Sequence, residues 1–273
     1  MISTARPRSS IWSYRSLILN FAQRDLKSRF KGTALGWAWS LLVPLATLFT
    51  YSLVFAVIFR AAPPNFGNGR PGFFPVWLFG GLIPWTFFLI AVNTAIPTLL
   101  ANGPILQKVY FPSYAPILGA VVAILVQSLI ECGIYAVALL VFGNVGLSWL
   151  LFPAWLAIYV LFVTAVAASL AILNVYYRDL AHLTNVALQL LFFLTPIIYQ
   201  ADSVPAEWHG IPLREIVLLN PIAEFVVSLR ALSYDLQAPP FFAWLAMSVW
   251  TIGAIAVAVF VYRRRGLDIG EAI

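Results

Sequence analysis

The stretch FAQRDLKSRFKGTALGWAWSLLVP, Phe21–Pro44, decides the fold because it joins a basic amphipathic segment to a long apolar run. The apolar run continues to Phe59, and Lys31–Gly32 marks the junction where water would meet lipid. If residues 14–31 form one helix, apolar side chains at three- and four-residue spacings share one face. These are Tyr14, Leu17, Ile18, Phe21, Ala22, Leu26 and Phe30.

A basic helix with one apolar face lies in the membrane interface and is attracted to anionic head groups. We therefore expect an amphipathic interface helix over residues 11–31, in which Asp25 and Arg29 pair one turn apart. Its charged residues are Arg24, Asp25, Lys27, Arg29 and Lys31. The alternative is a surface helix of a soluble domain, but the chain continues directly into lipid-compatible sequence. A secretory signal peptide fits poorly, because the apolar run at Leu35–Phe59 is too long.

The composition excludes an ordinary soluble protein. Of 273 residues, 62% are hydrophobic and 10% are charged, whereas globular domains contain about 25% charged residues. The single cysteine, Cys132, allows no internal disulfide and no cysteine metal cluster. Two histidines, His182 and His209, are too few for a histidine-rich metal site.

Six apolar segments are candidates to cross a bilayer core of about 30 Å, which needs about 20 helical residues. They cover residues 35–59, 76–100, 115–142, 149–175, 184–199 and 241–262. Gly80-Gly81, Pro84 and Pro97 are expected to interrupt the second, and the fifth is short. The sequence thus predicts an all-α integral membrane protein with six transmembrane helices in a single domain.

The basic residues predict the orientation. With both termini on one side, that side carries twelve basic residues: Arg6, Arg8, Arg15, Arg24, Lys27, Arg29, Lys31, Lys108, Arg178, Arg263, Arg264 and Arg265. The other side carries four: Arg60, Arg70, Arg214 and Arg230. Because cytoplasmic loops are enriched in lysine and arginine, we expect both termini in the cytoplasm.

Two inner connections, residues 101–114 and 176–182, are short and flanked by aromatic residues. One interpretation is a pair of tight turns with tyrosines anchored in the interface. The other is a docking surface for a cytoplasmic partner, with polar contacts from Arg178 and Asp179 and a charge from Lys108.

The outer connection, residues 200–240, shows helical periodicity at 213–235 on either side of Asn220-Pro221. Asparagine before proline suits a helix cap followed by proline in the first turn. In the second part a stripe of apolar residues comprises Ile222, Phe225, Val226, Leu229 and Leu232, with Glu224, Ser228, Arg230 and Asp235 mostly off it. We expect two short helices that re-enter the outer leaflet, or two helices that only anchor the loop in the interface.

Glu131 is the acidic residue placed well inside a predicted span, where an ionised group is costly. It either lines a pore and couples to an ion, or it is hydrogen-bonded to Gln127, Ser128 or another helix. The sequence has no G-x-x-x-x-G-K-[ST] motif, so we expect no ATP hydrolysis by this chain. No catalytic triad or metal-ligand spacing is convincing, and no enzyme is predicted.

Aromatic residues make up 15% of the chain. Such rings form interface belts and also stack on sugars, and belts and packing are the default. The residues considered as candidates to line a channel are Trp37, Trp39, Trp85, Phe87, Phe88, Glu131, Phe192 and Tyr199.

Several motifs resemble those of ABC-2 type permeases that export lipid-linked polysaccharides such as O-antigen, teichoic acid, capsule and galactan. The resemblance begins with RDLKSRFKGTALGWAWSLLVPL at Arg24–Leu45 and continues, in order, through most of the chain. The further motifs are GGLIPWTFF (80–88), NGPILQKVYFP (102–112), NVYYRDLAHLTNVALQLLFFLTPIIY (174–199) and LNPIAEFVVSLR (219–230). These motifs point to the permease group and not to a particular cargo.

The resemblance implies a homodimer in the bacterial cytoplasmic membrane, bound to two separate ATPase subunits that hold ATP and magnesium. No cofactor is expected in this chain, and no nucleic-acid partner. The residues that would match the family's ATPase-coupling elements are Ile105, Lys108, Tyr110, Phe111, Tyr177, Arg178 and Asp179. Those that would match its outer gate helices are Asn220, Pro221, Glu224, Phe225 and Arg230.

Three alternatives remain open from the sequence. A secondary transporter would use Glu131 as its coupling site, although the two halves show no obvious inverted repeat. A membrane glycosyltransferase would need carboxylates at one face, where only Asp202, Glu207 and Asp235 are available. An ABC-2 permease for drugs or small lipids is the nearest alternative, and we expect a different N-terminal motif in such chains.

Overall fold

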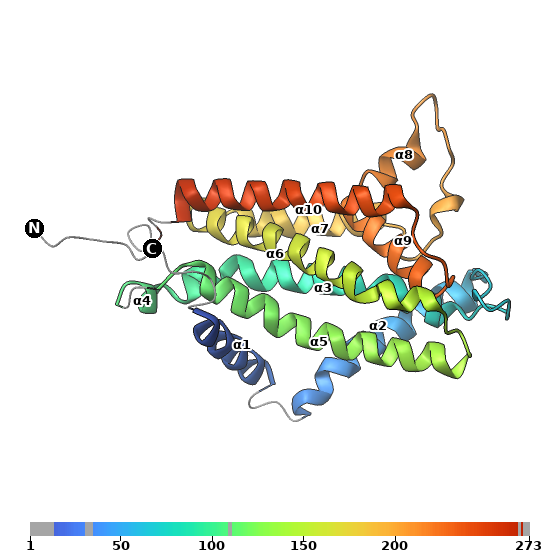
Figure 1. Ribbon diagram of the computed structural model, residues 1–273, viewed down its shortest axis with the longest axis horizontal. Coiled ribbons are helices and arrows are strands. Elements are labelled where there is room, and N and C mark those ends of the chain that lie inside the picture. Colours follow the sequence, from blue (N-terminus) through green and yellow to red (C-terminus); the bar gives the residue numbers. More distant parts are fainter. Residues whose placement is uncertain (1–13, 31–34, 109–110, 267–268, 270–273) are drawn as a thin grey trace, which may run out of the picture.

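The computed structural model describes residues 14–30, 35–108, 111–266 and 269, and within these ranges the chain forms helices joined by loops (Figure 1). An isolated antiparallel bridge joins Trp208 and Ile211. Tyr110 and Lys31, both singled out in the sequence, lie outside the described residues.

The long helices lie side by side in an elongated bundle, with α1 and α4 at the end where α10 finishes and α8 and α9 near the opposite end (Figure 1). The longer helices are α1 (Arg15–Phe30), α2 (Trp39–Ser52), α3 (Phe74–Ala101), α5 (Tyr114–Val141), α6 (Phe152–Tyr176), α7 (Leu180–Leu194), α9 (Pro221–Ser233) and α10 (Phe241–Val261). The shorter ones are α4 (Gly103–Leu106) and α8 (Leu213–Leu218). A π-helical turn extends α2 (Leu53–Ile58), and a 3-10 turn precedes α6 (Leu147–Leu151).

Five helices in the described part of the chain are long and apolar enough to cross a membrane. They cover Trp39–Ile58, Phe74–Ala101, Tyr114–Val141, Leu147–Tyr176 and Phe241–Gly266. Helix α7 is apolar but shorter, at 15 residues. The prediction of an all-α integral membrane protein is confirmed, and a sixth crossing through α7 stays a prediction.

Helix α3 lies at the centre of the bundle, in contact with α5, α6 and α9. In its most apolar window 78% of the residues are buried, against none in the window of α2. The expected interruption of this span is wrong, because the helix runs through Pro84 and Pro97 without a break. Side chains of α6 add hydrogen bonds to this helix: the Tyr159 hydroxyl donates to the Pro84 carbonyl, and Asn174 donates to the carbonyl of Ile96.

Helix α1 packs against the first half of α5. Phe21 and Ala22 are buried, and the ring of Phe21 lies 5.6 Å from that of Phe111. The two helices approach closely at Gly119, where an added Cβ atom would overlap the Cβ of Phe21. The apolar face predicted for this segment therefore packs on protein, and its position at the membrane interface stays a prediction.

The fifth predicted segment, residues 184–199, overlaps α7 only in part, since the helix begins at Leu180 and ends at Leu194. Thr195 is extended, with φ −103° and ψ 131°. It precedes Pro196, and the residue before a proline is disfavoured in the helical region. The carbonyls of the next two residues, Pro196 and Ile197, accept hydrogen bonds from Arg230 of α9.

Candidate coupling face and outer gate

One end of the bundle carries most of the exposed basic residues of the described chain, and Arg60 and Arg70 are exposed elsewhere. Lys27, Lys108, Arg178 and the run Arg263–Arg265 are all exposed at this end. The segment that follows α10 is held at this face, because Tyr176 donates to the carbonyl of Arg265 at 2.8 Å and Ser113 donates to that of Gly266 at 2.9 Å. The basic face is therefore anchored to α5 and α6.

The first predicted coupling element forms a single helical turn, α4, followed by Lys108. Ile105 and Lys108 are exposed, while Phe111 is buried against Phe21 of α1. The helix covers only Gly103–Leu106, so Lys108 and Phe111 lie outside it. The element thus has an exposed tip and a buried attachment to α1.

The second predicted element is the turn between α6 and α7. Tyr177, Arg178 and Asp179 are all exposed. The carbonyl of Asp179 accepts from the amides of His182 and Leu183, so this residue is the N-cap of α7. A contact made at this turn would act directly on the ends of two membrane helices.

The polar face of α1 differs from the prediction in one respect. Asp25 pairs with Arg24, at 3.3 Å, and not with Arg29 as expected. Arg29 turns inward, where it donates to the Thr94 hydroxyl of α3 at 2.9 Å and to Gln127 of α5 at 3.4 Å. Burial lowers the pKa of the Arg29 guanidinium, and the charge of Asp25 opposes that shift.

The same hydrogen-bonded row continues to Glu131. Gln127 donates to Glu131 Oε1 at 3.4 Å, and the Thr86 hydroxyl of α3 donates to Oε2 at 3.2 Å. Glu131 thus makes the expected hydrogen bond to Gln127, with Thr86 as the partner from another helix, and its role in pore lining or ion coupling stays a prediction. The row joins α1, α3 and α5, and sequence alone did not indicate that Arg29 would begin it.

The predicted outer helices are α8 and α9. The side chain of Asn220 accepts from the Ile222 amide at 3.0 Å, and Pro221 occupies the first turn, so the predicted cap is confirmed. The Asn220 amide also donates to Thr195 at 2.8 Å, which ties the start of α9 to the end of α7. Phe225 is fully buried against Tyr159 and Phe162 of α6, while Glu224 is half-buried.

Arg230 is the main correction to the expected outer gate. The sequence places it off the apolar stripe and in an outer loop, but its side chain is 5% exposed. The guanidinium donates to the carbonyls of Trp77, Pro196 and Ile197, and it lies 3.7 Å from the centre of the Trp77 ring. These acceptors make burial of the charge possible.

Two further residues fix the outer end of α9, and the sequence analysis missed both. Asn144 donates to the carbonyls of Ser233 and Tyr234, and it accepts from the amide of Asn68. The Tyr234 hydroxyl donates to the carbonyl of Pro64 at 2.9 Å. An asparagine in a loop and a tyrosine at a helix end are common, so their types carried no signal.

The candidate channel residues have different surroundings. Trp85, Phe87 and Phe88 are buried in the core of the chain, and Glu131 is hydrogen-bonded as described. Phe192 is partly exposed and stacks on Tyr51 of α2 at 5.9 Å. Trp39 is exposed, Tyr199 donates to the carbonyl of Phe193, and the side chain of Trp37 is outside the described part. Their role in a channel stays a prediction.

Among the described residues no three histidine, cysteine, aspartate or glutamate side chains are grouped to hold a metal ion.

Comparison with known proteins agrees with this architecture. The family model of the ABC-2 type transporter matches residues 16–234. The chain is 32% identical over 266 residues to the O-antigen export system permease protein RfbA of Myxococcus xanthus, covering 96% of this chain and 97% of that protein. It is 30% identical over 218 residues to a Klebsiella pneumoniae protein of the same name, covering 79% of each. It is 22% identical over 253 residues to the polysialic acid transport protein KpsM of Escherichia coli, covering 89% of this chain and 90% of that protein. The chain belongs to the ABC-2 type transporter family.

Proposed function

We propose that this chain is the membrane-spanning permease of an ATP-driven exporter for a lipid-linked polysaccharide. The observation that carries the proposal is similarity along almost the whole chain to a protein named for O-antigen export. The second, more distant similarity is to a protein named for polysialic acid transport. Both names favour a glycan cargo over a drug.

The basic face supports a cytoplasmic position for both termini in the bacterial inner membrane. Lysine and arginine gather at α1, α4, the α6–α7 turn and the end of α10, as expected for the cytoplasmic side of a membrane protein. In this orientation α8 and α9 lie at the outer side.

In the proposed mechanism, two separate ATPase subunits bind ATP and magnesium and press on the exposed residues of α4 and of the Tyr177–Asp179 turn. Phe111 transmits the movement from the α4 connection to Phe21 on α1. Arg29 connects α1 to α3 and α5 through Thr94 and Gln127. The movement therefore reaches α3, which α9 contacts at the other end.

Two copies of the chain would form the wet path that a long polar glycan needs. Helix α2 supports this arrangement, because the most apolar window of α2 and its π-helical extension has no buried residue within one chain. The rings of Tyr51 in α2 and Phe192 in α7 stack on each other, and both residues are partly exposed. They become candidates to face the sugar, together with Trp39.

Gentle purification in mild detergent tests the proposal. We expect a complex of two copies of this chain with two copies of an ATPase, which hydrolyses ATP. Replacement of Arg178 and Asp179 by alanine should lower the recovery of ATPase and its coupling, while Arg214→Ala, in the outer connection, should leave both unchanged. Isolation of an active transporter without an ATPase would refute the proposal.

A further inference from the structure

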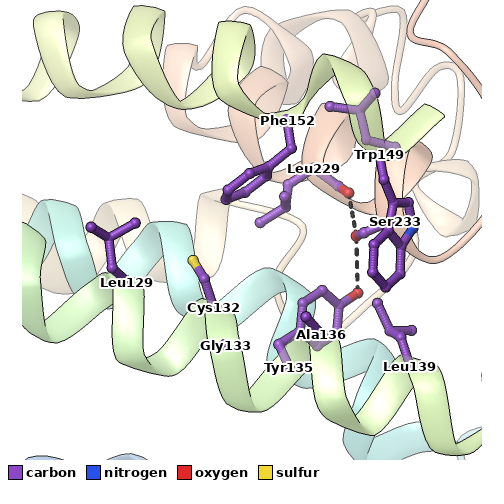
Figure 2. Close-up of a pocket in the computed structure, with 11 residues that line it drawn as sticks. Leu129, Cys132, Gly133, Tyr135, Ala136, Leu139, Trp149, Phe152, Leu229 and Ser233 are labelled. Carbon is purple, nitrogen blue, oxygen red and sulfur yellow. Dashed lines mark hydrogen bonds between the residues drawn. The ribbon is translucent and has the colours of Figure 1, made fainter. Parts of the chain in front are cut away.

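An apolar cavity of about 290 Å³ lies between α5, the start of α6 and α9 (Figure 2). Its lining includes Leu129, Cys132 and Gly133 of α5, Trp149 and Phe152 before and within α6, and Leu229 of α9. This volume is close to the lower end of the range of about 300–1,000 Å³ seen for small-molecule sites. Nothing in the proposed transport path uses this cavity.

The cavity is open toward the surroundings of the membrane helices. Leu129 and Gly133 are exposed on α5, and Val137 is exposed one turn further along the same helix. The lining carries no charged side chain. Apolar cavities are poor sites for water, which needs two to four polar partners, so hydrocarbon is the favoured occupant.

The polar atoms of the lining are largely used within the protein. The hydroxyls of Tyr135 and Ser233 lie 3.1 Å apart in a hydrogen bond, and Ser233 also bonds to the carbonyl of Leu229 (Figure 2). The indole nitrogen of Trp149 is buried without a hydrogen-bond partner. This nitrogen lies within the protein and not at the cavity surface, so the cavity presents an almost wholly apolar lining.

Trp149 also indicates the depth of the cavity. It follows the loop at residues 142–146, at the end of the bundle where α9 lies, and tryptophan is enriched at membrane–water interfaces. A lipid in this leaflet has its ester oxygens near the interface and its chain toward the bilayer centre. Trp149 lies at the interface end of the cavity, and the apolar lining extends from it along α5 to Leu129, toward the bilayer centre.

We propose that this cavity binds one hydrocarbon chain of a glycerophospholipid from the leaflet that surrounds the α9 end of the bundle. An empty void would leave its lining atoms without dispersion contacts, whereas a chain would contact α5, α6 and α9 together. The bound lipid thus stabilises the packing of the gate helix α9. The site is separate from the cargo path and does not depend on the identity of the cargo.

Gly133→Leu tests this site directly. An added Cβ atom at Gly133 meets no atom within 4 Å, so the leucine can enter the cavity without a clash. Gly253→Leu in α10 is the matched control, because a Cβ there also meets no atom within 4 Å and Gly253 is not part of the lining. Both substitutions replace a helix-interior glycine and therefore have similar effects on helix propensity.

The probe is a phosphatidylethanolamine with a diazirine in one acyl chain, incorporated into vesicles with the purified protein. After illumination, mass spectrometry locates the labelled peptides. We expect labelling of residues 129–139, 149–152 or 229–233 in the unchanged protein and in Gly253→Leu, and at least a tenfold loss in Gly133→Leu. Equal labelling in all three proteins, or labelling confined to other faces, would overturn the proposal. If Gly133→Leu does not fold, Ala136→Leu fills the same cavity and carries the same expectation.

Discussion

The contact between Gly81 and Arg230 allows a quantitative prediction. A Cβ atom at Gly81 would overlap the Arg230 guanidinium and lie 3.2 Å from the carbonyl oxygen of Ile197. We therefore expect Gly81→Ala to push the guanidinium away from the carbonyls of Pro196 and Ile197. Hydrogen bonds to charged groups contribute about 1.5–3 kcal/mol each, so the loss of two lowers the free energy of unfolding by about 3–6 kcal/mol.

The reason for this loss can be isolated with a double-mutant cycle. Arg230→Met removes the guanidinium and so removes the obstacle to a methyl group at Gly81. In that background Gly81→Ala should be neutral, or stabilising by up to about 1 kcal/mol because alanine favours the helix. The expected coupling energy between the two positions is therefore at least about 3 kcal/mol.

Equilibrium unfolding in mixed detergent micelles, followed by tryptophan fluorescence, measures the free energy of unfolding of four proteins. They are the unchanged protein, Gly81→Ala, Arg230→Met and the double variant. Gly119→Ala provides the control, because its Cβ overlaps Phe21 of α1 and not the guanidinium. Its effect should add to that of Arg230→Met within about 0.5 kcal/mol. Additive effects of Gly81→Ala and Arg230→Met would refute the argument that Gly81 makes room for the guanidinium.

Three further predictions concern the inner half. Glu131→Gln keeps an acceptor for Thr86, so export in vesicles should stay within about twofold, whereas an ion-coupled transporter would lose transport. Arg29→Met leaves the Thr94 hydroxyl and Gln127 without their donor and should lower the free energy of unfolding by about 1–3 kcal/mol, measured in the same micelles; no change would show that these hydrogen bonds contribute little. Phe111→Ala removes the ring that packs on Phe21, so the amides of α1 should exchange hydrogen faster while those of α3 do not, and equal protection of α1 would contradict its attachment through Phe111.

Much of the architecture follows from patterns of residue type. The span of α5, the helices on either side of Asn220-Pro221 and the cap itself are local features, because helix length, proline and capping side chains act over a few residues. The family resemblance inferred from Arg24–Leu45 and later motifs agrees with the match over residues 16–234. These parts could be predicted without knowing which helices touch.

The parts that could not be predicted depend on contacts between distant segments. Arg230 counted as an outer basic residue, because its sequence gives no sign of carbonyl acceptors from Trp77 and residues 196–197. Arg29 looked like a surface charge for the same reason. Aromatic residues were ambiguous from the start, since core packing, interface belts and sugar contacts use the same side chains.

The burial of α3 has a consequence for the order in which the protein is made. Helix α3 leaves the ribosome well before α9, yet the carbonyl of Trp77 is held by Arg230, 153 residues later in the chain. During synthesis α3 is present in the bilayer before α9, and so before Arg230, has been made. Chains that end before Pro221 never contain α9. Such shortened chains should be recognised and degraded by membrane proteases, whereas the native bundle is complete only after α9 has been inserted.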